Sequence, residues 1–203
     1  MATHTARKRA RGVTRTLRID AEVDEALRAW SSREGVSISS FANRALRKHV
    51  EWDVYADRFG FVSVPEDALA RMTAQLSEEQ AREVGTWMAE NVGPALVNFW
   101  FSKASAQEVV HTLPRLLSRY ARLYEFEERE DTDRIVQVFK HSGGRPTSAL
   151  LEALWRTMYR VVIPAAIETE IMDEAVVVSF DKAQVRGPIR RSRNGALADH
   201  VPA

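Results

Sequence analysis

The sequence predicts an α+β protein built in two parts. In the first, two copies of the chain would pair one strand each into an antiparallel ribbon beneath four helices. The second is a helix-rich α+β domain with a small antiparallel sheet. Three observations lead to this prediction: an alternating strand precedes two helix signals that Gly35 separates, a hairpin pattern and a valine-rich strand flank a later helix, and the composition turns from basic to acidic after about residue 50.

The segment 13–19 alternates polar and apolar residues, with Leu17 and Ile19 on one face of the predicted strand. A lone strand has no partner for its backbone and no cover for its apolar face, so we expect a second copy to pair with it. The opposite face of the ribbon then carries Thr14, Thr16 and Arg18 from each chain. A two-stranded ribbon of this kind fits a DNA major groove, and which of the three side chains lies over the groove centre stays open.

Two helices follow the strand. Asp20 is suited to cap a helix that runs to about Glu34, and Gly35 is the expected residue after its end. Ser39 is expected to cap a second helix that reaches about Trp52 or beyond. Because residues 50–58 contain no glycine or proline, we expect one continuous helix to lead into the second part.

Two further features favour contacts with phosphate. The amides of Ser39, Ser40 and Phe41 would be free at a helix start, where anions bind; an ordinary capped helix without a ligand is the alternative. We predict that residues 1–12 form a disordered basic arm whose Arg7, Lys8, Arg9 and Arg11 contact phosphates.

Charge is divided along the chain. Residues 1–50 carry a balance of +6, residues 51–185 a balance of −8, and residues 186–203, which we expect to form a disordered basic tail, a balance of +3. A basic head on an acidic body indicates that the head meets a polyanion, although basic tails also aid solubility.

Residues 14–50 resemble the ribbon-helix-helix DNA-binding proteins, the superfamily of the Arc, MetJ and CopG-type repressors. The resemblance lies in Thr16-Leu17-Arg18-Ile19-Asp20, in Glu25-Ala26-Leu27, and above all in the pattern Gly-x-Ser-x-Ser-x-apolar-x-x-x-Ala-Leu from Gly35 to Leu46. It implies an obligate homodimer on double-stranded DNA, with Thr14, Thr16 and Arg18 at base edges and the Ser39 and Ser40 amides on phosphate. Two dimers on adjacent half-sites, giving tetramers or higher assemblies, are also implied.

The domain boundaries that we predict are 13–54 for the head and 55–185 for the body. In the body we expect a short strand at 61–65, a helix at 66–76, a helix from the capping box Ser77–Gln80 to about Asn91 that Gly93-Pro94 closes, and a buried strand or helix at 95–102. A helix at about 106–122, kinked or divided by Pro114, comes next.

A hairpin is then predicted, with strands at 123–128 and 134–140 joined by a polar turn at 130–133. A helix from Pro146 to about Val162 and a last strand at 175–180 complete the antiparallel sheet. Between strand and helix lies a candidate ligand-binding loop of His141, Gly143, Gly144 and Ser148. A tight glycine turn in which His141 only caps or packs is the alternative.

The body is similar to a domain that follows ribbon-helix-helix heads in uncharacterised prokaryotic regulators. In that domain a strand ends in His-x-x-Gly and a helix with a serine follows, as His141, Gly144 and Ser148 do here. This resemblance implies no known ligand. The aromatic residues of the body either line a pocket for an apolar effector or simply form the core: Trp87, Phe99, Trp100, Phe101, Tyr120, Tyr124, Trp155 and Tyr159. A small-molecule or protein effector is therefore a further expected partner.

Several classes of chemistry are not expected. The chain has no cysteine, and its five histidines are far apart with no i,i+4 pair, so we predict no metal site. The carboxylates from Glu125 to Asp133 lack the central glycine of a calcium loop and are interpreted as a solvated turn. No catalytic or nucleotide-binding motif is present, so we expect neither an enzyme nor a cofactor. No run of about 20 apolar residues occurs, so we expect no membrane partner and a cytoplasmic, nucleoid-associated protein.

The sequence therefore favours a dimeric transcriptional regulator, a repressor, whose body assembles or senses an effector. The second hypothesis is an antitoxin-type interaction protein that represses its own operon. Antitoxin tails are short and disordered until bound, whereas this body has the composition of a folded core. An enzyme with a DNA-binding head is the third.

Overall fold

The computed structural model describes residues 13–101, 105–164 and 166–185, and it divides the chain into two compact units between Arg47 and Lys48. This boundary lies earlier than the one predicted after residue 54. The difference has a physical reason: Trp52 stacks on Tyr120 with ring centroids 5.9 Å apart and contacts Trp100 at 5.2 Å, so the segment after Lys48 belongs to the body.

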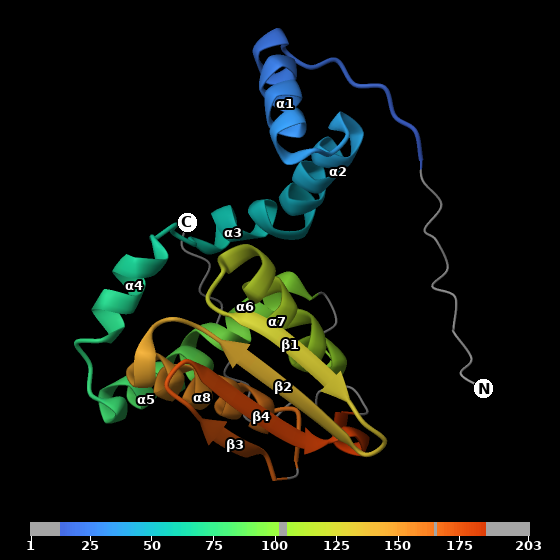
Figure 1. The fold of residues 1–203 in the computed structure, drawn as a ribbon. Coiled ribbons are helices and arrows are strands. Elements are labelled where there is room, and N and C mark those ends of the chain that lie inside the picture. Colours follow the sequence, from blue (N-terminus) through green and yellow to red (C-terminus); the bar gives the residue numbers. More distant parts are fainter. Residues whose placement is uncertain (1–12, 102–104, 165, 186–203) are drawn as a thin grey trace. The chain divides into compact units, whose positions relative to one another are not determined.

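The N-terminal unit consists of an irregular segment and two helices (Figure 1). Helix α1 (Ala21–Glu34) begins after Asp20 and ends at Gly35, whose φ of +65° lies in the left-handed region. The N–H of Val36 donates to the Ser31 carbonyl at 3.0 Å and closes the turn. Helix α2 (Ile38–Lys48) follows. The predicted order of helix, glycine turn and helix is confirmed, whereas the Asp20 side chain makes no capping hydrogen bond.

The cap of α2 differs from the prediction. Ser37 caps the helix instead of Ser39, because the N–H of Ser40 donates to Ser37 Oγ at 3.1 Å and the N–H of Phe41 donates to the Ser37 carbonyl at 2.9 Å. Both serines are good caps, and the pattern Ser37-Ile38-Ser39 does not distinguish them. The hydrogen bond from the Phe41 N–H to the Ser37 carbonyl places the first turn two positions earlier.

No strand occurs at 13–19 in the single chain; this segment has no regular secondary structure. Strand formation there was predicted to require a second copy, which a single chain does not supply. The sheet of the protein lies entirely in the C-terminal half.

Helical backbone continues beyond α2, as predicted for residues 50–58. A π-helical turn (His49–Asp53) leads into α3 (Val54–Phe59), which ends at Gly60 with φ +86°. The strand predicted at 61–65 is absent from the structure. Phe61 packs its ring instead on Trp52 at 5.0 Å, and this short apolar run has no neighbouring strand to pair with.

Two helices follow. Helix α4 (Glu66–Thr73) begins after Pro65, and α5 (Glu78–Trp87) begins with the predicted capping box. In it the Gln80 N–H donates to Ser77 Oγ at 3.2 Å, and the Ser77 N–H donates to Gln80 Oε1 at 2.9 Å.

The prediction that Gly93-Pro94 closes this helix is wrong. A π-helical turn (Met88–Val92) carries the backbone into α6 (Gly93–Trp100), with Pro94 in its first turn. A similar π-helical turn (Glu108–Thr112) precedes Pro114 in α7 (Leu113–Leu116), which continues through Leu117–Ala121. Because proline has no N–H to give the carbonyl four residues earlier, the helix widens before each proline instead of ending.

The sheet has four antiparallel strands in the order β1-β2-β4-β3: β1 (Glu125–Glu130), β2 (Arg134–Lys140), β4 (Ala175–Asp181) and β3 (Glu168–Ile171). The hairpin and the last strand are confirmed, with Phe126 opposite Phe139. Strand β3 was not predicted, because Glu168-Thr169-Glu170 is too short and too polar to show an apolar alternation.

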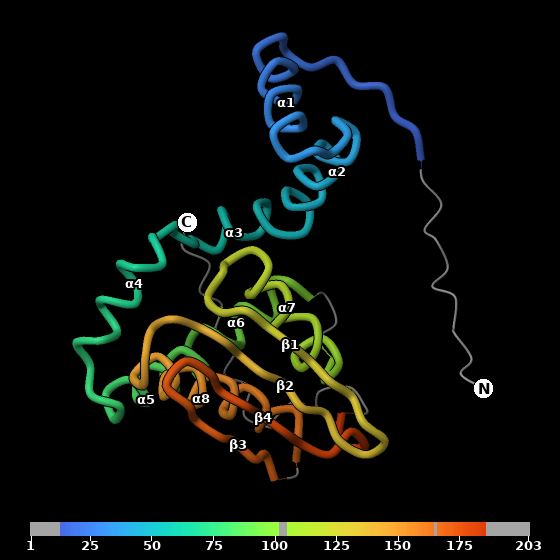
Figure 2. Tube along the Cα trace, in the orientation of Figure 1, coloured from blue at the N-terminus to red at the C-terminus, as the bar shows by residue number. Residues whose placement is uncertain are grey.

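Helix α8 (Gly144–Arg160) covers one face of the sheet, and α5 packs against α8 (Figure 1, Figure 2). Between α8 and the sheet lie the largest fully buried side chains, which form a continuous aromatic and aliphatic core: Trp155, Tyr159, Phe139, Phe180 and Ile135. The body is thus α+β as predicted. Within the described residues, every helix is too short or too polar to cross a bilayer.

Gly85 sets the distance between α5 and α8. A Cβ atom at this position would lie 2.2 Å from the Leu150 carbonyl oxygen and 3.1 Å from the Leu154 nitrogen, and both are backbone atoms that cannot rotate away. We therefore expect Gly85→Ala to force the two helices apart and to lower the free energy of unfolding by about 2 kcal/mol or more. Chemical denaturation of the variant measures this.

The matched control for this prediction is Glu83→Ala, an exposed position on the same helix. It should change the unfolding free energy by about 0.5 kcal/mol at most. Equal stability of Gly85→Ala and Glu83→Ala would show that the two helices are not in close contact.

Candidate functional site

The residues predicted to contact DNA bases lie in the exposed segment before α1. Thr14, Thr16 and Arg18 are all exposed, and so are the alternating apolar residues Leu17 and Ile19, at 65% and 45%. The single chain therefore leaves both faces of the predicted strand uncovered.

The rest of the N-terminal unit also lacks a core of its own. Trp30 of α1 is 49% exposed and Leu46 of α2 is 52% exposed. Among residues 13–47 as the structure describes them, Ser31 alone is buried. Burial of a large apolar side chain stabilises a fold by about 1.5–3 kcal/mol, and these exposed side chains do not contribute that stabilisation in the single chain.

At the start of α2 the structure changes which amides are available for phosphate. The Ser40 N–H is held by Ser37 Oγ and the Phe41 N–H by the Ser37 carbonyl. The amides of Ile38 and Ser39 come before the first intrahelical bond and point out of the helix start. The predicted anion site is therefore moved by one residue, to Ile38 and Ser39. Arg7, Lys8, Arg9 and Arg11, with the predicted arm 1–12 and tail 186–203, lie outside the described residues.

The loop after β2 is tied together by its own polar groups. The Gly143 N–H donates to His141 Nδ1 at 3.2 Å, so the ring proton sits on Nε2, which donates to Ser148 Oγ at 2.9 Å. Ser148 is fully buried, and its hydroxyl donates to the Met172 carbonyl at 2.6 Å. Gly144 has φ +71° and makes the turn into α8. This chain of bonds joins the loop to the turn before β4 and accounts for His141, Gly143, Gly144 and Ser148 without a ligand.

The structure also contains a buried polar network that the sequence did not reveal. Gln137 is fully buried on β2; its Nε2 donates to the Val110 carbonyl at 2.8 Å and to Glu128 Oε2 at 2.7 Å. The carbonyl of Val110 is the one that Pro114 cannot bond. Burial raises the pKa of Tyr159 well above its usual range, so its hydroxyl stays protonated and donates to Gln137 Oε1 at 2.6 Å.

Glu128 belongs to this network and not to a solvated turn. Its side chain is only 5% exposed, and it accepts from His111 Nδ1 at 2.8 Å and from Arg115 Nη2. Burial works to raise the pKa of Glu128, but the hydrogen bonds from His111 and Gln137 outweigh burial and leave that pKa below its usual value. Because Glu128 shares strand parity with Phe126, its inward position could have been read from the alternation.

His111, Glu128 and Glu130 also come close enough for a metal ion, with donor atoms within 4.8 Å of one another. The sequence analysis did not foresee this grouping, because the three lie on a helix and a strand. The cationic guanidinium of Arg115 and the amide N–H of Gln137 already occupy the Glu128 carboxylate, so the group is accounted for as an ion-pair network.

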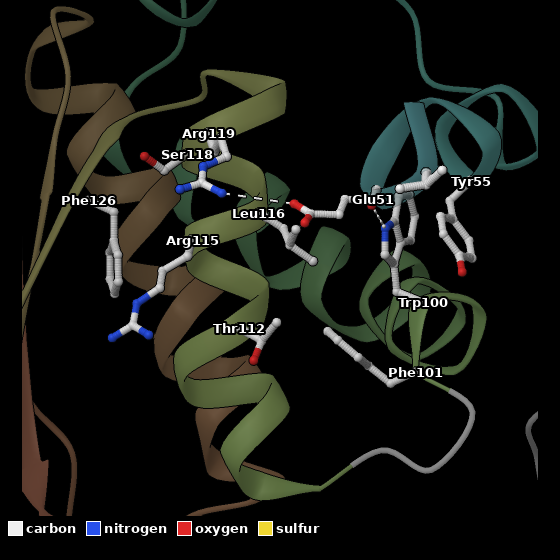
Figure 3. Close-up of a pocket in the computed structure, with 11 residues that line it drawn as sticks. Glu51, Tyr55, Trp100, Phe101, Thr112, Arg115, Leu116, Ser118, Arg119 and Phe126 are labelled. Carbon is white, nitrogen blue, oxygen red and sulfur yellow. Dashed lines mark hydrogen bonds and ion pairs between the residues drawn. The ribbon is translucent and has the colours of Figure 1, made fainter. Parts of the chain in front are cut away.

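A second feature that the sequence did not locate is an open groove of about 640 Å³ along the helix that contains α7. It is lined by cationic and aromatic side chains, among them Arg115, Arg119, Trp100, Phe101 and Phe126. In the view of Figure 3 this helix runs between Phe126 on one side and Trp100 with Phe101 on the other. Of the aromatic residues predicted to form a pocket or a core, Tyr124, Trp155 and Tyr159 are buried in the core, whereas Trp100 and Phe101 pack against it partly buried and also line this groove.

Comparison of the chain with family models, with curated proteins and with solved structures gives no match.

The half-buried position of His141 leads us to expect that the free energy of unfolding depends on pH. Burial lowers the pKa of His141 from the ordinary 6.5, and the charge of Glu174 opposes this only in part. Below about pH 6.5 the unfolded chain takes up a proton that the folded chain does not, so stability falls as the pH falls toward the lowered value. We expect His141→Asn to flatten the dependence of unfolding free energy on pH between 7.5 and 5, measured by urea denaturation.

Gln75→Asn is the control, because Gln75 is exposed, lies outside this loop and carries no titratable group. That variant should keep the pH dependence of the original chain. If His141→Asn also keeps it, the half-buried His141 ring is not held neutral in the folded chain.

Proposed function

We propose that this chain is a sequence-specific DNA-binding transcriptional regulator of the ribbon-helix-helix type, which acts as a dimer and represses transcription. The observation that carries the proposal is the N-terminal unit itself. It has the helices, the glycine turn and the alternating segment of that family, and it leaves its apolar residues exposed.

A second copy of the chain is the partner that completes this unit. Pairing of two segments 13–19 would satisfy their backbone groups and place Leu17 and Ile19 of both chains on one side. The exposed apolar residues of α1 and α2, such as Trp30 and Leu46, would then cover that side. Burial of these side chains in both chains supplies the stabilisation that the single unit lacks.

The remaining face of such a ribbon would carry Thr14, Thr16 and Arg18 into a DNA major groove. Arginine is the side chain best suited to a bidentate contact with guanine, and threonine contacts several bases. The Ile38 and Ser39 amides and the excess of positive charge in residues 1–50 favour phosphates on either side of the groove. A dimer seated on a promoter represses by excluding the polymerase, and neighbouring half-sites allow tetramers.

The antitoxin-type alternative predicts a body that folds only on its partner. The body has a closed core of its own around Trp155 and Phe139, which favours an assembly or sensor domain.

Arg18→Ala tests the proposed base contact. Selection of bound duplexes from a random pool gives the preferred site, and fluorescence anisotropy then compares that site with unrelated DNA. The variant loses one base contact per chain, so we expect binding to the selected site to weaken about ten- to hundredfold while binding to unrelated DNA changes little.

Arg28→Ala is the matched control, because it removes the same charge from α1, where Arg28 pairs with Asp24 at 2.6 Å. It should affect both DNAs slightly and equally. If Arg18→Ala retains the affinity of the original chain for the selected site, the ribbon does not read the bases.

A further inference from the structure

The groove beside α7 combines features that suit one class of small molecule. We propose that it binds an organic anion that carries an aromatic ring, such as an aromatic carboxylate. The inference deepens the sensor role in the proposed function and, as a regulatory site, rests on it; as a binding site it stands on the geometry alone.

The first feature is a pair of cations on one face of a helix. Arg115 and Arg119 are four residues apart and both line the groove, and Arg115 is held by its ion pair with Glu128. Arg119 is 65% exposed, and its Nη1 lies 3.9 Å from Glu51 Oε2. Charge-assisted hydrogen bonds are typically about 2.7–2.9 Å long, so this long ion pair can yield to a closer carboxylate.

The second feature is a fixed aromatic wall. The ring of Trp100 packs on Trp52 at 5.2 Å and on Tyr55 at 5.4 Å, and its Nε1–H donates to the Glu51 carbonyl at 3.3 Å. A ring held in this way loses little freedom when a flat ligand stacks on it. Leu116 and Phe101 extend the apolar surface next to it.

The charges of the groove-lining side chains favour a ligand with a negative charge. Arg115 is already paired with the Glu128 carboxylate, so Arg119, whose ion pair with Glu51 is long, is the groove-lining cation that a ligand anion can take, in a body whose charge balance is otherwise strongly acidic. Glu51 also accepts the Tyr120 hydroxyl at 2.6 Å, which gives its carboxylate a second partner. A ligand carboxylate can therefore take the Arg119 guanidinium while its ring lies against Trp100, as the arrangement in Figure 3 allows.

The position of Glu51 gives such binding a regulatory consequence. Glu51 lies in the π-helical turn His49–Asp53, which follows α2 directly in the chain. A ligand that draws Arg119 away from Glu51 alters the charge environment of the turn next to the proposed DNA-binding helices. We expect the ligand to change DNA affinity through this turn.

Isothermal titration calorimetry of the full chain without DNA tests the site with indole-3-acetate. We expect saturable binding of one molecule per chain with a Kd of about 1 mM or tighter, as a ligand of this size allows. The neutral indole-3-acetamide should bind at least about tenfold more weakly, and inorganic phosphate should not compete, because it has no ring.

Three variants test which side chains contribute to ligand binding. Arg119→Gln should weaken indole-3-acetate binding about tenfold, and Glu51→Gln should strengthen it, because the competing charge is gone while an acceptor for Tyr120 remains. Arg160→Gln, an exposed arginine at the end of α8, should leave binding unchanged. Thermal unfolding confirms that each variant is folded.

The proposal is overturned by no saturable binding below about 10 mM, well above the affinity expected for a ligand of this size. Equal affinity for the acid and the amide overturns it too, as does full affinity in Arg119→Gln. Because these titrations contain no DNA, their outcome does not depend on whether the proposed DNA-binding function is correct. If indole-3-acetate binds as expected but leaves the affinity for the selected DNA unchanged, the groove is a ligand site and the regulatory step is wrong.

Discussion

The structure depends first on a shortage of buried surface in residues 13–47. Two helices and one extended segment are too little chain to enclose a core, and here Trp30, Leu46, Leu17 and Ile19 all remain exposed. Folding of this unit must offset the entropy of ordering its backbone, about 1–2 kcal/mol per residue, without burial to do so. In the proposed dimer a second chain supplies that burial, so the proposed DNA contacts depend on pairing of two chains.

The body, in contrast, buries a core within one chain. Its sheet is covered by α8, and the close approach of α5 at Gly85 adds a further layer. The polar network around Gln137 lies inside this core, and the described residues satisfy each of its members: the carbonyl that Pro114 leaves open, the Glu128 carboxylate and the Tyr159 hydroxyl. A buried amide with all its bonds made fixes the register of the helix against the sheet at little cost.

Short sequence patterns predicted the features that depend on neighbouring residues, such as helix ends and turns. Gly35 ended α1 because a left-handed residue was required there, and the Ser77–Gln80 capping box started α5. The polar turn predicted at 130–133 marked the hairpin. Where two residues of one type compete, the pattern could not decide, as with Ser37 and Ser39. Prolines 94 and 114 were expected to end or kink helices, whereas the backbone widened into π-helical turns that the surrounding packing stabilises.

Features that arise from distant segments were not predicted. The groove joins residues near 51, 100, 116 and 126, and the Glu128 cluster joins a helix to a strand, so no short pattern contains either. Strand β3 exists because β4 offers it an edge. The base-contacting role of Thr14, Thr16 and Arg18 is a property of two chains together, and it stays a prediction.

Sedimentation of the full chain over a range of concentrations tests whether two copies pair. We expect a species of twice the 23.0 kDa chain mass at micromolar concentration, and a shift to single chains when Leu46, on the exposed face of α2, is replaced by Asp. The core of the body should remain folded in that variant. A single-chain mass at all concentrations, with α1 and α2 stably folded, would contradict the account, because residues 13–47 would then be stable without a partner.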